Sequence, residues 1–313
     1  MLTGCTEASI SQDQPGCAEL QLSVAPIAGT LGCVQRFTSY DGTELAYRLA
    51  GRGRPLVCLP GGPGRAADYL GDLGGLPAHR QLVLLDNRGT GASATPGDVA
   101  SYRCDRLVDD VEALRTHLGL DRLDLLGHSA AGNTATLYAA RHPHRLDRLI
   151  LLTPGLRAVG IELTEDEWLA AIRRRAGEPW YADAYAALMA WDAGEDTAHN
   201  RSKAAPLFYG RWDDEIAAHA ASDVGQRTAP AAVHFADDGA FDPEQTRAAL
   251  TEVTAPVLVY AGELDPAPAP RQAGELAALF PRGDLVVQPG AGHFPWLDDP
   301  AWFVEAVVRF LAA

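Results

Sequence analysis

The feature that most constrains the fold is a repeated alternation of short apolar runs with segments of helical spacing. The runs lack a polar face, so each is expected to form a strand that is buried on both sides of a sheet. Strands of this kind alternate with helices in mainly parallel sheets that are flanked by helices. After a hairpin at 36–49, the predicted strands are 55–59, 81–85, 123–126, 148–153, 256–260 and 284–288, and the predicted helices are 103–118, 131–141, 270–280 and 300–312. The sequence therefore predicts an α/β fold.

The alternation stops between residues 156 and 250, a stretch with helical character and no convincing buried strand. It resumes at Pro256, so the sheet-forming residues fall into two blocks of the chain. We expect a core domain made of residues 31–155 and 251–313, with a helical cap at 156–250 inserted between the two blocks. Residues 1–30 are small and polar without a clear period, and we expect them to form a loosely packed N-terminal arm.

The balance of charge excludes two classes of partner. The chain has 26 Lys and Arg residues against 41 Asp and Glu residues, which gives a net charge of −15. A protein that binds nucleic acid needs a basic face for the phosphate backbone, and an anionic membrane surface attracts basic segments. We therefore expect neither a nucleic acid nor a membrane as a partner.

The five cysteines are scattered, odd in number, and form no Cys-x-x-Cys pair. This usage predicts neither a metal centre nor a disulfide framework, and it favours a reducing, cytoplasmic compartment. Leu2-Thr3-Gly4-Cys5 resembles a bacterial lipoprotein box, but no charged segment or apolar run precedes it. A signal peptide needs both of these regions, so lipoprotein export is expected only if the true start lies upstream.

The strongest chemical signal is Gly127-His128-Ser129-Ala130-Ala131, which lies between a predicted strand and a predicted helix. A serine at such a sharp turn has a strained backbone, and its neighbours two positions away must be small. Gly127 and Ala131 meet this requirement, although glycine is usual at both positions. The turn places the hydroxyl of Ser129 above the sheet edge, and we predict that Ser129 is a nucleophile.

A serine nucleophile needs a general base, and the base needs an acid that orients it. In this architecture the chain order is serine, acid, histidine. Asp265 and His293 follow the last two predicted strands, so both are expected at the sheet edge that carries Ser129. Glu263 is an alternative acid, although it lies two residues nearer its strand. We predict a triad of Ser129, His293 and Asp265, and we expect the other eight histidines to have ordinary surface or interior roles.

The tetrahedral intermediate of acyl transfer needs two backbone N–H donors. One is predicted to be the amide of Ala130, directly after the nucleophile. The other is predicted to be the amide of Gly62, in the loop Pro60-Gly61-Gly62-Pro63-Gly64 after the first buried strand. Glycine lets this backbone approach a substrate closely. The loop contains no Gly-x-Gly-x-x-Gly pattern, so it predicts no dinucleotide site, and we expect no cofactor and no metal.

Taken together, these residues resemble the α/β-hydrolase superfamily over residues 37–313. The loop at 60–64 and the motif Asp86-Asn87-Arg88-Gly89-Thr90-Gly91-Ala92-Ser93 look like the prolyl iminopeptidase branch, which has His-Gly-Gly-Pro-Gly and Asp-x-Arg-Gly-x-Gly-x-Ser. The chain departs from that branch at Pro60, where histidine is expected. It also departs at the serine turn, where Gly-Gly-Ser-Trp-Gly is common, and this turn is similar to that of esterases and carbon–carbon bond hydrolases.

In the prolyl iminopeptidase branch, acidic cap residues hold the free amino terminus of the substrate. Trp191-Asp192 stands where that family often has Trp-Glu, so the resemblance implies that Trp191 and Asp192 bind substrate. The region 156–250 contains 17 acidic and 9 basic residues, and a negative cap would attract an amine. The alternative is an ordinary charged surface, because the whole chain is acidic. Four cap tryptophans either line an apolar pocket or only pack the cap onto the core.

The sequence therefore predicts a cofactor-free serine hydrolase that forms an acyl-enzyme. The resemblance favours a proline iminopeptidase-like aminopeptidase that releases an N-terminal residue from small peptides or amides. An esterase, lactonase or thioesterase of small-molecule metabolism is the alternative, and a non-catalytic receptor with a hydrolase fold is a more distant one. The expected partner is a small-molecule or short-peptide substrate, and the oligomeric state is left open.

Overall fold

The computed structural model describes residues 32–313. Within them, a sheet of eight strands has the order β1-β2-β4-β3-β5-β6-β7-β8. β2 pairs antiparallel with β1 and with β4, and every other neighbouring pair is parallel. The strands are β1 (Gln35–Thr38), β2 (Glu44–Ala50), β3 (Pro55–Leu59), β4 (Gln81–Asp86), β5 (Leu123–His128), β6 (Leu146–Leu152), β7 (Val257–Gly262) and β8 (Gly283–Gln288). The predicted arm, residues 1–30, and the lipoprotein-like Cys5 lie outside the described residues.

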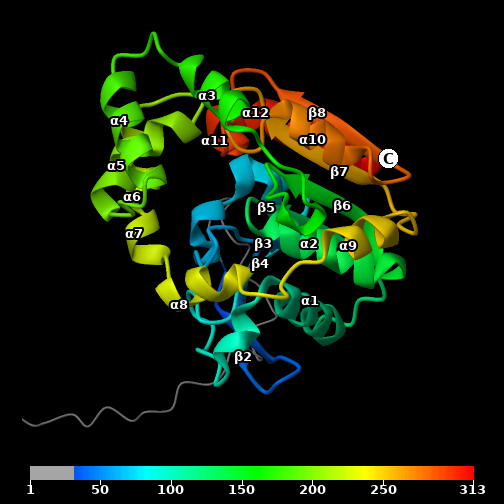
Figure 1. Cartoon of the computed structure of the whole chain (residues 1–313). Coiled ribbons are helices and arrows are strands. Elements are labelled where there is room, and N and C mark those ends of the chain that lie inside the picture. The colour runs from blue at the N-terminus through cyan, green and yellow to red at the C-terminus, as the bar shows by residue number, and fades with distance from the viewer. Residues whose placement is uncertain (1–31) are drawn as a thin grey trace, which may run out of the picture.

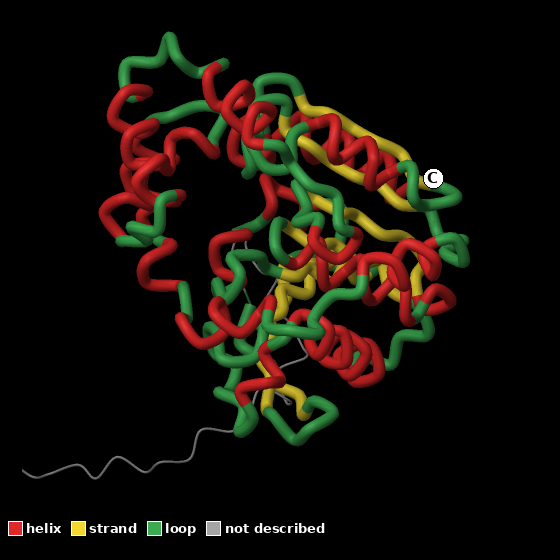
Figure 2. Tube along the Cα trace, viewed as in Figure 1, coloured by secondary structure: helices red, strands yellow, loops and turns green. Residues whose placement is uncertain are grey.

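Helices cover both faces of the sheet, and a group of short helices stands to one side of it (Figure 1). Figure 2 shows the strands running through the middle of the molecule, with helices around them. The helices are α1 (Cys104–His117), α2 (Ala131–Arg141), α3 (Glu165–Arg173), α4 (Tyr181–Asp192), α5 (Ala198–Ala204), α6 (Asp214–Ala221), α7 (Asp223–Gln226), α8 (Ala229–Val233), α9 (Pro243–Leu250), α10 (Pro270–Ala277), α11 (Pro295–Asp298) and α12 (Pro300–Ala312). The predicted α/β architecture with a mainly parallel sheet is confirmed.

The central strands sort their apolar side chains onto two faces, because successive residues of a strand point to opposite sides. In β5, Leu125 packs into one core cluster and Leu126 into the other. In β7, Val259 and Tyr260 are divided in the same way. Side chains of α1, α2 and α10 complete the first cluster, and side chains of α11 and α12 complete the second. Burial on both faces explains why these strands are continuous apolar runs.

Two helices begin with the same capping pattern, and the start of one of them, α12, agrees with the sequence prediction. The carboxylate of Asp299 accepts a hydrogen bond of 3.0 Å from the backbone N–H of Trp302, and Pro300 occupies the first turn of α12. The carboxylate of Asp242 caps α9 in the same manner, and Pro243 occupies its first turn. An acidic cap followed by proline satisfies a free N–H group and fixes the backbone for the first turn. Both helices therefore begin at their proline.

The segment between β6 and β7 carries helices α3 to α9. Of its four tryptophans, Trp168, Trp180 and Trp191 pack against a separate apolar cluster that α3, α4 and α5 form among themselves. Trp212 instead packs edge-on against the ring of Tyr209, with 5.7 Å between the ring centres. The last helix of the segment, α9, lies against α2, and its buried Leu250 belongs to the main core cluster. By its packing, α9 is therefore part of the core, although it falls within the segment 156–250 that the sequence predicts as a cap.

The Asp86–Ser93 motif braces the chain at the end of β4. One carboxylate oxygen of Asp86 accepts a hydrogen bond from the backbone N–H of Ala67 at 2.9 Å, and the other accepts from Ala92 at 2.9 Å. The buried guanidinium of Arg88 forms a bidentate pair with Asp110 of α1, at 2.8 and 2.5 Å. Fork-shaped pairs of this kind fix orientation as well as charge. The motif thus holds the chain after β4 in place.

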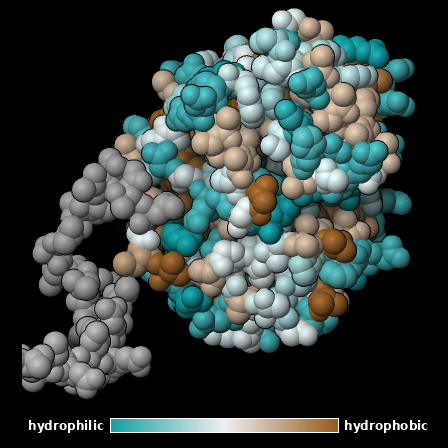
Figure 3. Space-filling model, turned by 90° about the vertical axis from the view of Figure 1, so that its left-hand side faces the viewer, coloured by the Kyte–Doolittle hydropathy of each residue, from teal (hydrophilic) through white to brown (hydrophobic). Residues whose placement is uncertain are grey.

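Polar and weakly apolar residues are intermixed on the surface of the cap side. Figure 3 shows this face in teal, white and tan, with strongly hydrophobic residues confined to small separate spots. No helix within residues 32–313 combines the length and the hydropathy that crossing a membrane requires.

Candidate active site

Ser129 lies in a sharp turn between β5 and α2. Its φ angle is 55°, a left-handed conformation that costs energy for any residue with a side chain. A side chain at Gly127 would collide with the backbone oxygen of Ala131. The Ala131 side chain itself is only 2% exposed and fits at the position where glycine is usual. The residues two positions before and after Ser129, Gly127 and Ala131, are therefore small as the turn requires. The turn directs the serine hydroxyl away from the sheet.

The structure brings Ser129, His293 and Asp265 into one chain of hydrogen bonds. The Oγ atom of Ser129 lies 2.8 Å from Nε2 of His293, and Nδ1 of His293 lies 2.7 Å from Oδ2 of Asp265. The other oxygen of Asp265 accepts a 3.0 Å hydrogen bond from the backbone N–H of Ala267. Because the carboxylate accepts the proton of Nδ1, the Nε2 atom is left to accept the serine proton. This is the arrangement that general-base activation of a serine needs.

The alternative acid, Glu263, has a different partner. Its carboxylate accepts a 2.8 Å hydrogen bond from the backbone N–H of Gly290, and its side chain is exposed. Asp265 is fully buried. Glu263 thus braces the loop that carries His293, and Asp265 is the acid that contacts the imidazole.

The two predicted oxyanion donors are available for a ligand. Neither the amide of Gly62 nor that of Ala130 donates to an acceptor within residues 32–313. A side chain at the neighbouring Gly61 would lie 2.7 Å from the backbone oxygen of His128 and from the Cβ atom of Ser129. Glycine at 61 therefore lets the loop after β3 pack directly against the serine turn. Both free amides lie on backbone segments that flank Ser129.

A buried chain of hydrogen bonds beneath the serine was not predicted. The backbone N–H of Gly61 donates to the hydroxyl of Tyr69 at 2.7 Å, and that hydroxyl donates to Nδ1 of His128 at 2.7 Å. Nε2 of His128 donates to the backbone oxygen of His293 at 3.0 Å. Burial lowers the pKa of His128 well below its usual value, so the ring is neutral and can accept at Nδ1. This chain of hydrogen bonds joins the loop at 60–64, which carries the predicted oxyanion donor Gly62 and is called the oxyanion loop below, to the loop that carries His293.

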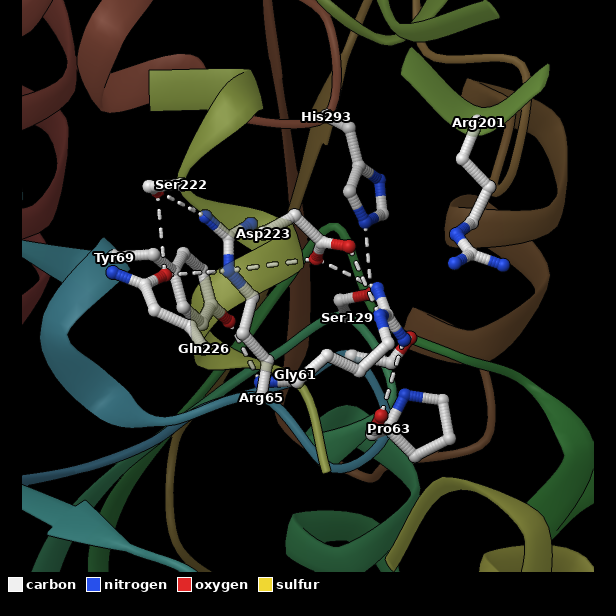
Figure 4. A network of polar contacts seen from close by, with 12 residues as sticks. Gly61, Pro63, Arg65, Tyr69, Ser129, Arg201, Ser222, Asp223, Gln226 and His293 are labelled. Carbon is white, nitrogen blue, oxygen red and sulfur yellow. Dashed lines mark hydrogen bonds and ion pairs between the residues drawn. The ribbon is translucent and has the colours of Figure 1, made fainter. Parts of the chain in front are cut away.

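Two arginines fasten the cap to the oxyanion loop. Arg227, directly after α7, donates from Nη1 to the backbone oxygens of Gly62 and Pro63, at 3.0 and 3.2 Å. Its Nε and Nη2 atoms donate to the carboxylate of Asp223 at 3.0 and 2.8 Å. The buried Arg65 donates to the side chain of Gln226 at 2.9 Å. Figure 4 shows Arg65 beside Gln226, Ser222 and Asp223 of the cap. These contacts and those of Arg227 fix where this part of the cap lies relative to Gly62.

A cavity of about 290 Å³ opens above Ser129 and His293, between the sheet edge and the cap. Of the two residues that the resemblance assigns to substrate binding, Trp191 lines this cavity, whereas Asp192 is not among its lining residues and its side chain is exposed at the end of α4. The charged residues that do line it are Arg65, Arg201, Asp223 and Arg227. Other lining residues include Tyr69, Ser202, Phe208, Tyr209, Val224 and Phe294.

Sequence reasoning missed Tyr69, His128 and the charged residues of the cavity. The signal for the arginines was weak, because Arg201 and Arg227 are two basic residues in a long acidic segment without a regular period. The fold alone brings them to one wall. Among residues 32–313, no three His, Cys, Asp or Glu side chains come together as a group that could hold a metal ion.

With the site described, three comparisons identify the family. Residues 54–300 match the family described as alpha/beta hydrolase fold. N-formylmaleamate deformylase of Pseudomonas putida is 29% identical over 278 residues, which cover 87% of this chain and 94% of the relative. Proline iminopeptidase of Heyndrickxia coagulans is 25% identical over 269 residues, with coverage of 83% and 91%.

A solved structure supports the same assignment. The crystal structure of proline iminopeptidase from Mycobacterium smegmatis matches with a TM-score of 0.66 and 26% identity, over 89% of this chain and 98% of that chain. The resemblance to α/β-hydrolases with prolyl iminopeptidase-like relatives is thus confirmed. The chain is therefore a hydrolase that belongs to the alpha/beta hydrolase fold family.

Proposed function

We propose that the chain is a serine hydrolase that cleaves an ester or amide bond of a small substrate through an acyl-enzyme. The observation that carries this proposal is the hydrogen-bonded chain from Ser129 through His293 to Asp265 at the floor of the cavity. The free amides of Gly62 and Ala130 supply the second requirement of acyl transfer, which is stabilisation of an oxyanion.

The geometry supports the following sequence of steps. The Ser129 oxygen attacks the substrate carbonyl while Nε2 of His293 takes the serine proton, and the negative oxygen of the tetrahedral intermediate accepts from Gly62 and Ala130. Collapse breaks the bond to the leaving group, which takes the proton from His293. Water then attacks the acyl-serine ester, gives its proton to His293, and releases the acid when Ser129 is reprotonated. Asp265 holds the imidazole in the required tautomer throughout.

The sequence favours an aminopeptidase over an esterase, but the charges of the cavity favour the opposite order. An aminopeptidase must hold a substrate ammonium group, for which it needs an uncommitted carboxylate near the serine. Asp192 lies outside the cavity, and the one carboxylate that lines it, Asp223, is bound by both Nε and Nη2 of Arg227. We therefore propose an ester or amide hydrolase first. A proline iminopeptidase-like aminopeptidase is the second candidate, supported by its similarity to the named iminopeptidases.

The test of the catalytic proposal is labelling with a fluorophosphonate, which reacts with activated serines. We expect the wild-type protein to be labelled once, and Ser129→Ala to remain unlabelled. Ser202→Ala is the matched control, because Ser202 lines the same cavity and forms no hydrogen bond with a histidine in the described chain. Labelling that survives Ser129→Ala, or its absence in the wild type, would reject the proposal in favour of another nucleophile or a non-catalytic receptor.

A substrate panel separates the two candidates. It compares 4-nitroanilides of proline with free and acetylated amines, together with uncharged 4-nitrophenyl esters. The first candidate predicts brisk ester cleavage with no requirement for a free amine. A preference of a hundredfold or more for the free-amine anilide would instead establish the aminopeptidase.

A further inference from the structure

The cavity above Ser129 has a charge opposite to that of the chain. The protein carries a net charge of −15, yet three arginines and one aspartate line the cavity. The histidines on its wall add no negative charge, and the carboxylate of Asp265 lies behind His293, with which it is paired. An excess of guanidinium groups around a small cavity is a physical reason for an anion to enter it.

Two of the three arginines are mostly committed to protein partners. Arg227 uses Nε, Nη1 and Nη2 on Asp223 and on the oxyanion loop. Arg65 is 4% exposed and binds Gln226 and Ser222, and its guanidinium carbon lies 4.2 Å from the ring centre of Tyr69. Both residues add positive potential to the cavity, but their main contacts are structural.

Arg201 is different, because most of its donors are free. Its Nη1 atom pairs with the side chain and backbone oxygen of Asp196, which is 61% exposed. Its Nε and Nη2 atoms have no acceptor within residues 32–313. Figure 4 shows the side chain of Arg201 extending from the cap on the opposite side of Ser129 and His293 from Arg65, as seen in that view. A planar pair of N–H groups that faces a cavity matches the two oxygens of a carboxylate.

The rest of the wall suits the uncharged part of such a substrate. Trp191, Phe208 and Val224 supply apolar surface on the cap side. The volume of about 290 Å³ lies near the small end of the range for small-molecule sites, which is about 300 to 1,000 Å³.

We infer that this hydrolase selects small esters or amides that carry a carboxylate, and that Arg201 binds this carboxylate through Nε and Nη2. The inference rests on the proposed function, in that it assigns the substrate class of the same serine. Arg201 is then a specificity residue that distinguishes anionic from neutral and cationic substrates.

The test uses three 4-nitrophenyl esters with acyl chains of the same length: the monosuccinate, the butyrate and the β-alaninate. They differ only in a terminal carboxylate, methyl or ammonium group. The background rate is measured with Ser129→Ala and subtracted. We expect kcat/KM for the succinate to exceed that for the butyrate by about tenfold to hundredfold, the range for a hydrogen-bonded charge pair, with the β-alaninate slowest. Added salt should reduce this preference, because Arg201 is partly exposed.

Arg201→Gln should reduce the ratio of succinate to butyrate to near one. Lys203→Gln is the matched control, because it removes the same charge from the same helix, α5, at an exposed position that does not line the cavity. It should leave the ratio as in the wild type. Equal rates for succinate and butyrate, a preference for the ammonium ester, or the same loss of ratio in both variants would overturn the inference.

Binding to Ser129→Ala keeps the inference separate from the catalytic proposal. N-(4-nitrophenyl)succinamate and N-(4-nitrophenyl)butyramide are stable analogues of two of the esters, and calorimetry measures their Kd without turnover. Tighter binding of the succinamate by about tenfold or more, lost when Arg201→Gln is added, supports the inference even if no ester is hydrolysed. Equal affinities in a protein that does hydrolyse esters would reject the inference and leave the catalytic proposal intact.

Discussion

The side chains of the triad on the sheet side and Arg201 on the cap side differ in how completely their polar atoms are paired. On the sheet side, Asp265 is fully buried and both of its oxygens accept hydrogen bonds. On the cap side, the Arg201 side chain is 28% exposed, and only one of its three nitrogens has a partner in the described chain.

This difference indicates a division of labour. A reaction that is the same for every substrate benefits from groups that are held in place before the substrate arrives. Recognition of a particular substrate needs donors that are still free. We therefore expect substitutions on the sheet side to affect all substrates alike, and substitutions at free positions of the cap to change which substrate is preferred.

The largest expected effect is the loss of the nucleophile or its base. Ser129→Ala and His293→Ala should each lower kcat by about 10⁴- to 10⁶-fold for every substrate, and the double variant should be no worse, because the two residues act as one unit. Initial rates with an activated ester measure this effect. A double variant that is much slower than either single variant would show that the two residues act independently.

Asp265→Asn should lower kcat by about 10³- to 10⁴-fold, because an amide at this position favours the wrong tautomer of His293. Glu263→Gln is the matched control, since it alters a carboxylate two residues away that contacts Gly290 and not His293. It should change kcat by less than about threefold. The reverse order of the two effects would move the acid of the triad to Glu263.

His219, on α6, should contribute to the pH dependence of stability. Burial lowers its pKa to about 4, so the unfolded chain binds this proton more readily than the folded chain between pH 6.5 and 4. Stability is therefore unaffected above pH 6.5 and falls as the pH decreases through this window, by at most about 3 kcal/mol. Urea unfolding at pH 7 and pH 4.5 measures the loss.

Two histidine variants test whether the loss of stability at low pH comes from His219. His219→Gln should flatten the acid limb of the stability curve, whereas His199→Gln, at an exposed position on α5, should not. An identical acid limb in both variants and the wild type would show that His219 is not the source.

Tyr69→Phe should lower kcat less than the triad substitutions do, because it changes only supporting hydrogen bonds on the sheet side of the cavity. It removes the acceptor of the Gly61 amide and the donor to His128, and each orphaned buried group costs about 1–3 kcal/mol of stability. Because the change loosens the oxyanion loop, we expect kcat to fall by roughly tenfold with little change in KM. Tyr260→Phe, which removes a buried hydroxyl bonded to Gln288, neither residue lining the cavity, should lower stability and leave kcat unchanged.

The smallest expected effect is that of Asp192→Asn. This residue is exposed at the end of α4 and does not line the cavity, so kcat/KM should change by less than about twofold for esters and for free-amine anilides alike. A loss of more than tenfold for the free-amine substrate alone would restore the amine-binding role that the sequence suggested.

The residues found from the sequence are those on which the backbone imposes a local requirement. The turn at Ser129 needs small neighbours, and Gly61 is needed where the loop meets that turn, so both leave a pattern of small residues in the chain. Asp265 and His293 follow β7 and β8. The apolar runs of these strands predict where the strands end, and thus where the two residues lie. These requirements involve residues that are close in the chain, so the patterns they leave can be recognised in a single sequence.

The residues that were missed depend on contacts between distant segments. Tyr69 meets His128 across 59 positions of the chain, and Arg227 meets Gly62 across 165. No spacing or local composition marks such pairs. Asp192 was predicted to bind substrate but does not line the cavity. A helical segment without a regular apolar period does not reveal which of its faces points toward the cavity.

The most direct test of the account is to trap the acyl-enzyme and locate it. Rapid mixing of the protein with 4-nitrophenyl butyrate, quenching in acid and intact mass measurement should show one added butanoyl group per chain, and peptide mapping should place it on Ser129. A burst of 4-nitrophenolate close to one equivalent should accompany it. Two results would contradict the proposed mechanism. One is ester hydrolysis without any acyl adduct in the quenched protein, and the other is an adduct on another residue such as Ser202.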